Sequence, residues 1–278
     1  CIAMLNSNAS TRRSSGDSMP IIGILASSST FRSLVSAICL VYGILPGRDG
    51  EMCRTSADKL LAYSTWNFTL TDPIDNLVLG LDRALKTLSG AYSAARPSPG
   101  TDAADVVLDE SERKHAAGLM RVNHAGEICA QALYEGQSLT AKGDAARQSL
   151  QQAAAEERDH LAWCRARLDE LDARPSVLDP LFYGASYALG ALTGLAGDKV
   201  SLGFVEATEE QVVEHLEQHL DELPTADHKS RAILDQMRAD ESEHGAQALA
   251  MGGQVFPAPV KQMMSLISKL MTRTTYRV

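Results

Sequence analysis

The sequence ERDH at residues 157–160 and the sequence ESEH at residues 241–244 share the pattern Glu-x-x-His. Within a helix, residues three positions apart lie on the same side, one turn from each other. Each pattern therefore places a carboxylate beside an imidazole, an arrangement suited to binding a metal ion. Two such helices facing one another bring both Glu-His pairs into a shared helical core.

A further glutamate precedes each pattern at a similar distance. Glu127 lies 30 positions before Glu157, and Glu209 lies 32 positions before Glu241. The chain thus repeats one helical hairpin, with a glutamate on its first helix and Glu-x-x-His on its second. Four glutamates and two histidines are the ligands of ferritin-like di-iron and di-manganese proteins. We predict an all-α, ferritin-like four-helix bundle with a long apolar crossover and extra amphipathic helices.

Spacing alone does not decide whether some of the glutamates are metal ligands. Glu206 shares a helix face with Glu209, and spacing alone ranks them nearly equally as the ligand from that helix. Glu112 and His115 have the Glu-x-x-His spacing as well. They have no matching place in the two-hairpin plan, and we interpret them as a solvent-exposed face at a polar helix start.

Three further histidines lie near the candidate ligands in the sequence. His124 follows the reversed order, His-x-x-Glu, and is interpreted as an end-of-helix or outer group. His215 and His219 are most simply surface groups or groups that surround the ligands. Asp240 lies four residues before His244 and could orient that imidazole, as outer carboxylates commonly do.

The ligand chemistry favours iron or manganese. Structural zinc sites prefer thiolates and close at four ligands, whereas mixed carboxylate and imidazole ligands suit iron or manganese. Burying several carboxylates without a cation would force some of them to take up protons. Surface acids would have lysines one turn away, but the flanking positions here are largely Ala, Leu and Ile. We therefore predict a metal site.

Composition agrees with a helical protein. The chain has 278 residues, of which 5% are aromatic, and Ala, Leu, Glu and Gln are abundant, which favours helix over sheet. A net charge of −9 argues against non-specific binding to nucleic acid. The chain has no CxxC motif, so we interpret its cysteines as reduced thiols in a cytoplasmic setting. They are Cys1, Cys39, Cys53, Cys129 and Cys164.

Three regions differ in composition. Residues 1–65 are rich in Ser and carry an apolar run, Leu34–Pro46, behind basic residues. This run could be a signal segment or anchor, but we favour an extension, disordered or absent from the native protein, with Met52 as the true start. Residues 66–105 contain an amphipathic helix and a Pro/Ser/Ala-rich linker that we expect to be mobile. Residues 106–278 form the metal-binding bundle.

Apolar periodicity, Gly and Pro set the expected helices. The helix before the linker spans about 74–90. The bundle helices and the segments joining them are expected over about 111–142, 144–173, 178–196, 199–223, 225–251 and 259–273. Gly126 is expected to interrupt the first of these just before Glu127.

The crossover between the hairpins has no charged residue from Pro180 to Gly197, yet glycines interrupt it. A membrane-spanning helix needs about 20 apolar residues, so a segment that dips into one leaflet or lines an apolar channel fits better.

The last helix carries an apolar stripe and positive charge. Its stripe either lies on a membrane surface or packs on the bundle, and the uncharged crossover makes the membrane surface the preferred interpretation. The stripe consists of Val260, Met263, Met264, Ile267, Leu270 and Met271, and the basic residues are Lys261, Lys269, Arg273 and Arg277.

Four stretches resemble one known family. They are RVNHAGEICAQALYEGQSLTA (121–141), EERDHLAW (156–163), DKVSLGFVEATEEQVVEHL (198–216) and MRADESEHGAQA (237–248). They look like the bacterial demethoxyubiquinone hydroxylases, which are membrane-associated di-iron enzymes of ubiquinone biosynthesis. The resemblance runs from about Asp72 to the C-terminus.

The resemblance implies a ligand set and a reaction. Position by position, it implies that two iron ions are bound and that Glu209, not Glu206, is the ligand from its helix. The implied reaction is hydroxylation of a polyprenyl methoxy-benzoquinol ring with O₂, using electrons from the quinol or from a nicotinamide-linked reductase. The implied ligands are Glu127, Glu157, His160, Glu209, Glu241 and His244.

The same resemblance implies a place in the cell. The enzyme would be a peripheral protein on the cytoplasmic face of the bacterial membrane, in contact with lipid and with other ubiquinone-biosynthesis proteins.

Two other functions fit the residues less well. A ferroxidase or iron-binding protein has no need of the apolar crossover, and a non-catalytic lipid-binding scaffold has no need of six intact ligands.

Overall fold

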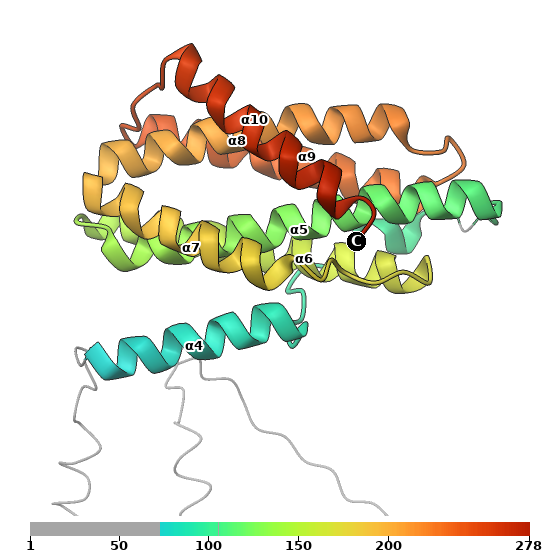
Figure 1. Cartoon of the computed structure of the whole chain (residues 1–278), viewed down its shortest axis with the longest axis horizontal. Helices are drawn as coiled ribbons and strands as arrows, with labels where there is room; N and C mark the ends of the chain where they lie inside the picture. Colours follow the sequence, from blue (N-terminus) through green and yellow to red (C-terminus); the bar gives the residue numbers. More distant parts are fainter. Residues whose placement is uncertain (1–72, 105) are drawn as a thin grey trace, which may run out of the picture. The chain divides into compact units, whose positions relative to one another are not determined.

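The computed structural model describes residues 73–104 and 106–278, and all the regular structure in these ranges is helical (Figure 1). The predicted extension over residues 1–65, with its alternative start at Met52, lies outside the described residues. The α-helices are α4 (Pro73–Ser89), α5 (Glu110–Thr140), α6 (Asp144–Glu170), α7 (Asp179–Ala196), α8 (Asp198–Glu222), α9 (His228–Ala250) and α10 (Ala258–Thr275).

The core of the molecule is a four-helix bundle made of two hairpins. α5 packs against α6, and α8 packs against α9; the hairpins then meet along α6–α9 and α5–α8. The predicted all-α, ferritin-like bundle is confirmed, and the expected helices differ from the observed ones by a few residues at their ends. Gly126 does not interrupt α5, which continues unbroken through this position.

The start of α5 assigns a local role to Glu112. The side chain of Asp109 accepts hydrogen bonds from the backbone N–H groups of Ser111 and Glu112, and the Glu112 carboxylate accepts one from the N–H of Asp109. This reciprocal capping satisfies N–H groups that have no partner within the helix, and such caps contribute about 1 kcal/mol. Glu112 is therefore a capping residue and not merely part of a solvent-exposed face.

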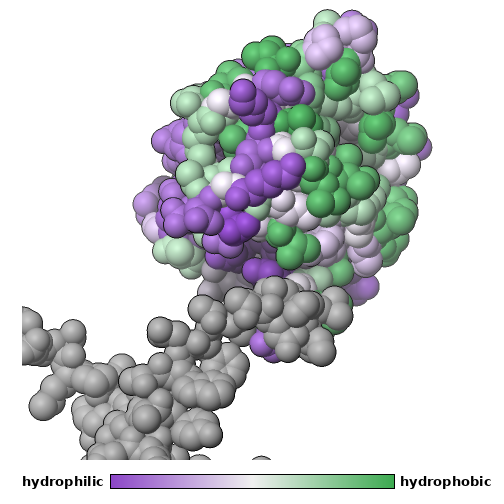
Figure 2. All heavy atoms as spheres, turned by 90° about the vertical axis from the view of Figure 1, so that its left-hand side faces the viewer, coloured by the Kyte–Doolittle hydropathy of each residue, from purple (hydrophilic) through white to green (hydrophobic). Residues whose placement is uncertain are grey.

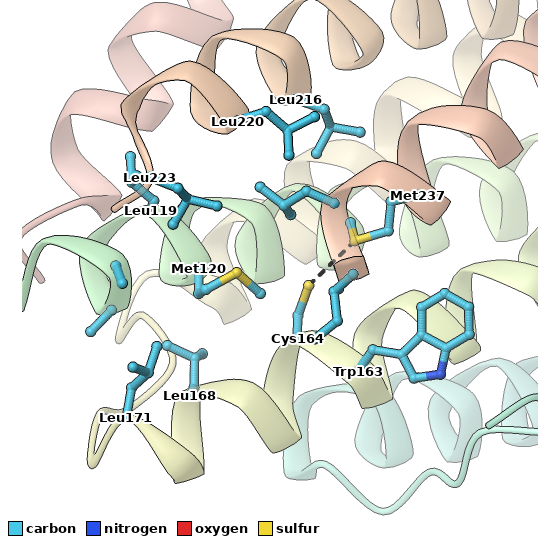
Figure 3. Close-up of a cluster of buried hydrophobic side chains, with 14 residues drawn as sticks. Leu119, Met120, Trp163, Cys164, Leu168, Leu171, Leu216, Leu220, Leu223 and Met237 are labelled. Carbon is cyan, nitrogen blue, oxygen red and sulfur yellow. Dashed lines mark hydrogen bonds between the residues drawn. The ribbon is translucent and has the colours of Figure 1, made fainter. Parts of the chain in front are cut away.

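Two apolar clusters lie toward opposite ends of the bundle. The first takes residues from 116–120, 163–171, 216–223 and 233–237, and the thiol of Cys164 lies 3.7 Å from the sulfur of Met237 within it (Figure 3). The second takes residues from 130–141, 146–154 and 202–205, together with Ala248. On each bundle helix, the candidate ligands lie between these two clusters in the sequence.

The crossover helix α7 lies against α5 with almost no side chain between the two backbones. A Cβ atom added at Gly190 would lie 2.2 Å from the carbonyl oxygen of Leu133, and one at Gly136 would lie 2.2 Å from that of Tyr187. Contrary to our expectation, Gly184, Gly190 and Gly194 do not interrupt the crossover helix, and Gly190 in particular lets α7 approach α5. Gly197, at φ 117°, does end α7.

The opposite face of α7 is apolar and exposed. Among the described residues, no helix combines the length and the apolar character needed to cross a bilayer. The exposed leucines of α7 are Leu181, Leu189, Leu192 and Leu195.

The segment between α4 and α5 is held against the bundle and is not the mobile linker that its composition predicts. The backbone N–H of Ala95 donates to Asp159 on α6 at 2.6 Å, and the indole N–H of Trp163 donates to the carbonyl of Arg96. Residues Pro99–Asp102 form a short 3-10 helix that packs on α9, where Gly100 is buried beside the backbone of Lys229.

The last helix, α10, runs obliquely across the bundle against α5 and α8 (Figure 1). Its C-terminal end is fastened by Tyr276, whose hydroxyl lies 2.7 Å from Nδ1 of His115. The other ring nitrogen of His115 lies 3.0 Å from the carbonyl oxygen of Glu222. His115 therefore joins α5 to α10 and to the end of α8, and it is half-buried and bonded on both ring nitrogens, not merely part of a solvent-exposed face.

The glycine contact between α5 and α7 can be tested by adding a single methyl group. We expect Gly190→Ala to lower the free energy of unfolding by about 1–3 kcal/mol, because the new Cβ must push two backbones apart. Gly184→Ala on the same helix is the control, since its Cβ meets no described atom within 4 Å. It should raise stability by up to about 1 kcal/mol through helix propensity alone. Equal denaturation midpoints for the two variants would contradict this account.

Candidate metal centre

Six buried side chains meet in the middle of the bundle. They form two groups of four whose ligand atoms all lie within 4.8 Å of one another, and the two groups share Glu157 and Glu241. The first group is completed by Glu127 and His160, and the second by Glu209 and His244. The structure thus brings together all six residues that the sequence proposes.

Both imidazoles point the same ring nitrogen at the carboxylates. Nδ1 of His160 lies 3.2 Å from Glu157 and 2.9 Å from Glu241, and Nδ1 of His244 lies 3.3 Å and 3.1 Å from the same two residues. In each histidine, Nε2 faces outward to another acid. A neutral imidazole that donates from Nε2 keeps the lone pair of Nδ1 free for a cation.

Glu157 and Glu241 occupy a bridging position. Glu157 approaches His160 with Oε2 and His244 with Oε1, whereas Glu241 approaches His160 with Oε1 and His244 with Oε2. Each carboxylate therefore presents one oxygen to either half of the site. Glu127 belongs only to the half that contains His160.

Glu209 lies in the cluster and Glu206 does not. The buried hydroxyl of Tyr134 donates a hydrogen bond to Glu209, and burial together with the charge of Glu241 raises the pKa of Glu209 well above its usual value. Glu206 instead forms an ion pair with Lys261 on α10, whose Nζ lies 3.0 Å from Oε1 of Glu206. The geometry thus separates two residues that spacing left tied.

Each histidine is held by an acid from the other hairpin. Nε2 of His160 lies 3.0 Å from Asp240 on α9, and Nε2 of His244 lies 2.7 Å from Glu156 on α6. Asp240 therefore contacts His160 and not His244, the imidazole that sequence spacing suggested. The role of Glu156 was not predicted from the sequence. A signal for it exists, because an acidic residue directly precedes the glutamate of both Glu-x-x-His patterns.

The proximity of the buried groups shifts their pKa values. Burial and the charge of Glu157 raise the pKa of Glu127 well above its usual value. Burial also acts to raise the pKa of Glu157, but hydrogen bonds with His160 and His244 outweigh it and lower that pKa. Burial acts to lower the pKa of His244, yet hydrogen bonds with Glu157 and Glu241 raise it to about 12. The raised pKa values of Glu127 and His244 favour their protonated forms, and a bound cation would displace those protons.

Two of the carboxylates have oxygens that are not satisfied by hydrogen bonds, which is also consistent with a bound cation. Oε2 of Glu127 and Oε1 of Glu157 are buried and form no hydrogen bond of good geometry among the described residues, although each lies near an imidazole nitrogen, at 3.5 Å from His160 and 3.3 Å from His244 respectively. A buried, unpaired carboxylate oxygen is costly unless a cation or donor reaches it. Glutamate oxygens and imidazole nitrogens together suit iron or manganese, so the residues present fit the group that the sequence predicts.

The remaining histidines lie outside the cluster. Nε2 of His124 lies 3.1 Å from the hydroxyl of Tyr92, and its other nitrogen faces Asp179. His219 is buried against Asn123 and is therefore not a surface group. Its ring lies 3.9 Å from that of His215, and burial lowers the pKa of His215 to about 4 and that of His219 to about 3.

An apolar cavity of about 220 Å³ adjoins the cluster. Glu127, Glu209 and Glu241 contribute to its wall, while most of the remaining lining is apolar. α7 and α10 form part of the wall, and Gly126 borders space in which an added Cβ meets no described atom within 4 Å. An engineered cavity of about 150 Å³ holds benzene, so this one accommodates a substituted aromatic ring.

Comparison with known proteins gives a consistent result. A family model described as "Ubiquinone biosynthesis protein COQ7" matches residues 114–275. The chain is 56% identical over 209 residues to a 3-demethoxyubiquinol 3-hydroxylase of Pseudomonas putida (strain W619), covering 74% of this chain and 96% of that relative. Proteins of the same name from Pseudomonas aeruginosa (strain LESB58) and Pseudomonas fluorescens (strain SBW25) are 57% and 56% identical over the same length and shares.

The bridging geometry leads to a prediction about metal stoichiometry. We expect Glu157→Ala and Glu241→Ala to lose both metal ions, because each residue presents an oxygen to both halves of the site. Glu209→Gln should lose tight binding of one ion only, since the neutral amide cannot balance its charge. Titration with Co²⁺, followed by its visible spectrum, counts the sites.

Glu206→Gln is the matched control, because it changes the same residue type one turn away on α8. It should bind two ions as the wild type does and lose at most about 1 kcal/mol of stability with its ion pair. Loss of metal in Glu206→Gln and full binding in Glu209→Gln would show that the assigned ligand on α8 is wrong.

Proposed function

The chain belongs to the ubiquinone biosynthesis protein COQ7 family, and we propose that it is a 3-demethoxyubiquinol 3-hydroxylase that contains two iron ions. The observation that carries this proposal is the pair of overlapping carboxylate–imidazole groups beside an apolar cavity. The reaction inserts one oxygen atom of O₂ into a ring C–H bond and reduces the other to water. Two electrons come from the quinol or from a nicotinamide-linked reductase.

The six clustered side chains are the proposed iron ligands. Glu127 and His160 would hold one ion, Glu209 and His244 the other, and the two shared glutamates would bridge them. When bound, the iron pair supplies the electrons and coordination sites that O₂ activation requires. The glutamates and histidines act as ligands in this proposal and not as acid or base catalysts.

The protein's own contribution is to orient and enclose. Asp240 and Glu156 accept hydrogen bonds from Nε2 of the two histidines and so fix which ring nitrogen faces the centre. Tyr134 holds Glu209 from the side of α5. The two apolar clusters flank these groups along the helices and exclude water from them.

The cavity is the proposed site for the quinol ring. Its wall brings Glu127, Glu209 and Glu241 next to apolar side chains, so a ring bound there lies beside the iron ligands. α7 and α10 line the same cavity, and a prenyl tail would leave between them. Of the stripe predicted on α10, Met264 and Met271 line the cavity, whereas Met263 and Leu270 are exposed. Part of the stripe therefore packs on the bundle, and its exposed part supports the proposed membrane surface.

The exposed apolar side chains are the proposed membrane face. Hydrophobic surface gathers mainly on one side of the bundle in the end-on view (Figure 2). α10 contributes Met263, Leu266, Ile267 and Leu270, beside the exposed leucines of α7. Together with basic residues such as Lys269 and Arg273, this surface suits a peripheral position on the anionic cytoplasmic leaflet.

The rival functions make less use of these features. A ferroxidase needs a path for hydrated ions, whereas the cavity beside the cluster is mainly apolar. A lipid-binding scaffold does not need six buried ligand residues, which are costly to keep in a helical core. The hydroxylase uses both the ligands and the cavity.

The proposed reaction is tested by isotope transfer. Protein loaded with two Fe²⁺ per chain, given a short-tailed demethoxyubiquinol and ¹⁸O₂, should yield a hydroxylated quinol that carries one ¹⁸O atom by mass spectrometry. Separate reactions with and without a nicotinamide cofactor and reductase distinguish the electron donors. Oxidation of Fe²⁺ without a labelled product would favour the ferroxidase.

The cavity can be filled without touching a ligand. Gly126→Leu should leave the metal content unchanged and lower turnover by roughly 10²-fold, because the new side chain displaces the ring from its reacting position. Gly184→Leu is the control, since Gly184 also faces open space but does not line the cavity. Normal turnover in Gly126→Leu would show that the quinol binds elsewhere.

The membrane face can be tested by placing charge on it. Leu192→Glu with Leu266→Glu should release the protein from vesicles that contain anionic lipid, since each buried leucine contributes about 1.5–3 kcal/mol. The pair should keep its iron, because neither residue lines the cavity. Val107→Glu, which changes an exposed valine outside α7 and α10, should still sediment with vesicles. Release by both changes would contradict a localised membrane face.

A further inference from the structure

Arg96 lies outside the bundle helices, yet its guanidinium reaches the surroundings of the metal centre. Its Nε donates to Asp159 at 2.7 Å, and its Nη1 lies 2.9 Å from Oδ2 of Asp240. The same oxygen of Asp240 lies 3.0 Å from Nε2 of His160. A continuous chain of contacts therefore runs from the segment before α5 to one of the proposed ligands.

The position of Arg96 is itself fixed on several sides. Its guanidinium lies 4.9 Å from the ring centroid of Trp163, and the Trp163 indole donates to the Arg96 carbonyl. Asp159 accepts the backbone N–H of Ala95 in addition to the guanidinium. The arginine head is thus held between a ring and two carboxylates, each of which contacts a different nitrogen of the planar guanidinium.

Among the described residues, His244 has no comparable support. Asp240 is held by Arg96 and by the amide of Gln236 and is 14% exposed, whereas Glu156, which contacts His244, is 36% exposed. The remaining side-chain bond of Glu156 comes from Gln152, a residue at the surface. The two halves of the centre therefore share the same ligand pattern but differ in how their imidazoles are supported.

We propose that Arg96 is a positioning residue for the metal centre. It holds Asp240 against His160, and so fixes the orientation of this imidazole and which nitrogen faces the metal. The segment between α4 and α5 then belongs to the centre functionally, although it contributes no ligand. This inference rests on the proposed metal centre and adds that its two ions are held unequally.

Two substitutions of Arg96 test the idea in the full-length protein with Co²⁺ as the probe. Arg96→Met keeps the alkyl stem over Trp163 and removes the charge, and should weaken one of the two sites by about 10–100-fold. Arg96→Lys should recover part of this loss, because an ammonium group can pair with only part of the two-carboxylate site. The second site should keep its wild-type affinity in both variants.

Arg238→Gln is the matched control. Arg238 is 40% exposed against 38% for Arg96, and it also pairs with two acids, Asp235 and Glu217. Neither of these acids contacts a proposed ligand, so both Co²⁺ affinities should be unchanged. The thermal midpoints of the metal-free proteins show whether either substitution affects folding.

A double-mutant comparison separates positioning from general destabilisation. Asp240→Asn combined with Arg96→Met should weaken the site no more than the stronger single change, because both break one chain of contacts. Glu156→Gln combined with Arg96→Met should show independent losses at the two sites.

The outcomes separate failure of this inference from failure of the proposed function. Wild-type protein that binds no Co²⁺ would overturn the metal centre itself. Two wild-type-like sites in Arg96→Met, or an equal loss at both sites, would overturn the role of Arg96 alone. Should Arg96→Met fail to fold, wild-type affinity at both sites in Arg96→Lys would overturn it equally.

Discussion

Four carboxylates enclosed by four helices are the constraint on which the rest of this structure depends. Charges of one sign repel strongly where little water can screen them, so such a cluster persists only with cations or protons between its members. The helices are held by apolar contacts toward either end, and the acids occupy the middle. Packing energy from residues such as Leu168 and Tyr134 thus keeps groups together that would otherwise separate. The same repulsion would favour ions of high positive charge at the proposed centre.

The same constraint explains why the centre opens to an apolar space. A polar opening would let water compete for the carboxylates, whereas the walls supplied by α7 and α10 keep it away. α7 achieves this through a backbone contact with α5, which leaves its outer face free to carry leucine. One crossover helix therefore closes the bundle on its inner side and presents hydrocarbon on its outer side.

Much of the fold and the site follows from the sequence because helical periodicity is local. The spacing from Glu157 to His160 predicts that these side chains share a helix face, and the repeated hairpin predicts that four helices meet. The contacts that the sequence did not predict depend on which helices are neighbours in space. The contacts of Asp240 with His160 and of Glu156 with His244 cross between hairpins, so distance along the chain gives no measure of them. The fixed position of the segment around Arg96 was not predicted for a related reason. Its Pro- and Ser-rich composition reflects local backbone preference, whereas its position depends on the carboxylates of Asp159 on α6 and Asp240 on α9.

The mixed origin of the two ligand groups has a consequence for how the protein is made. The first group draws on α5, α6 and α9, and the second on α6, α8 and α9, so neither hairpin holds a complete set. During synthesis the N-terminal hairpin leaves the ribosome first, and it carries only three of the six residues. Neither proposed ion site could be complete until α9 has emerged and docked, which would place metal acquisition after almost all of the chain has been translated. A half-made chain would then be unable to hold a redox-active ion in an unfinished, exposed setting.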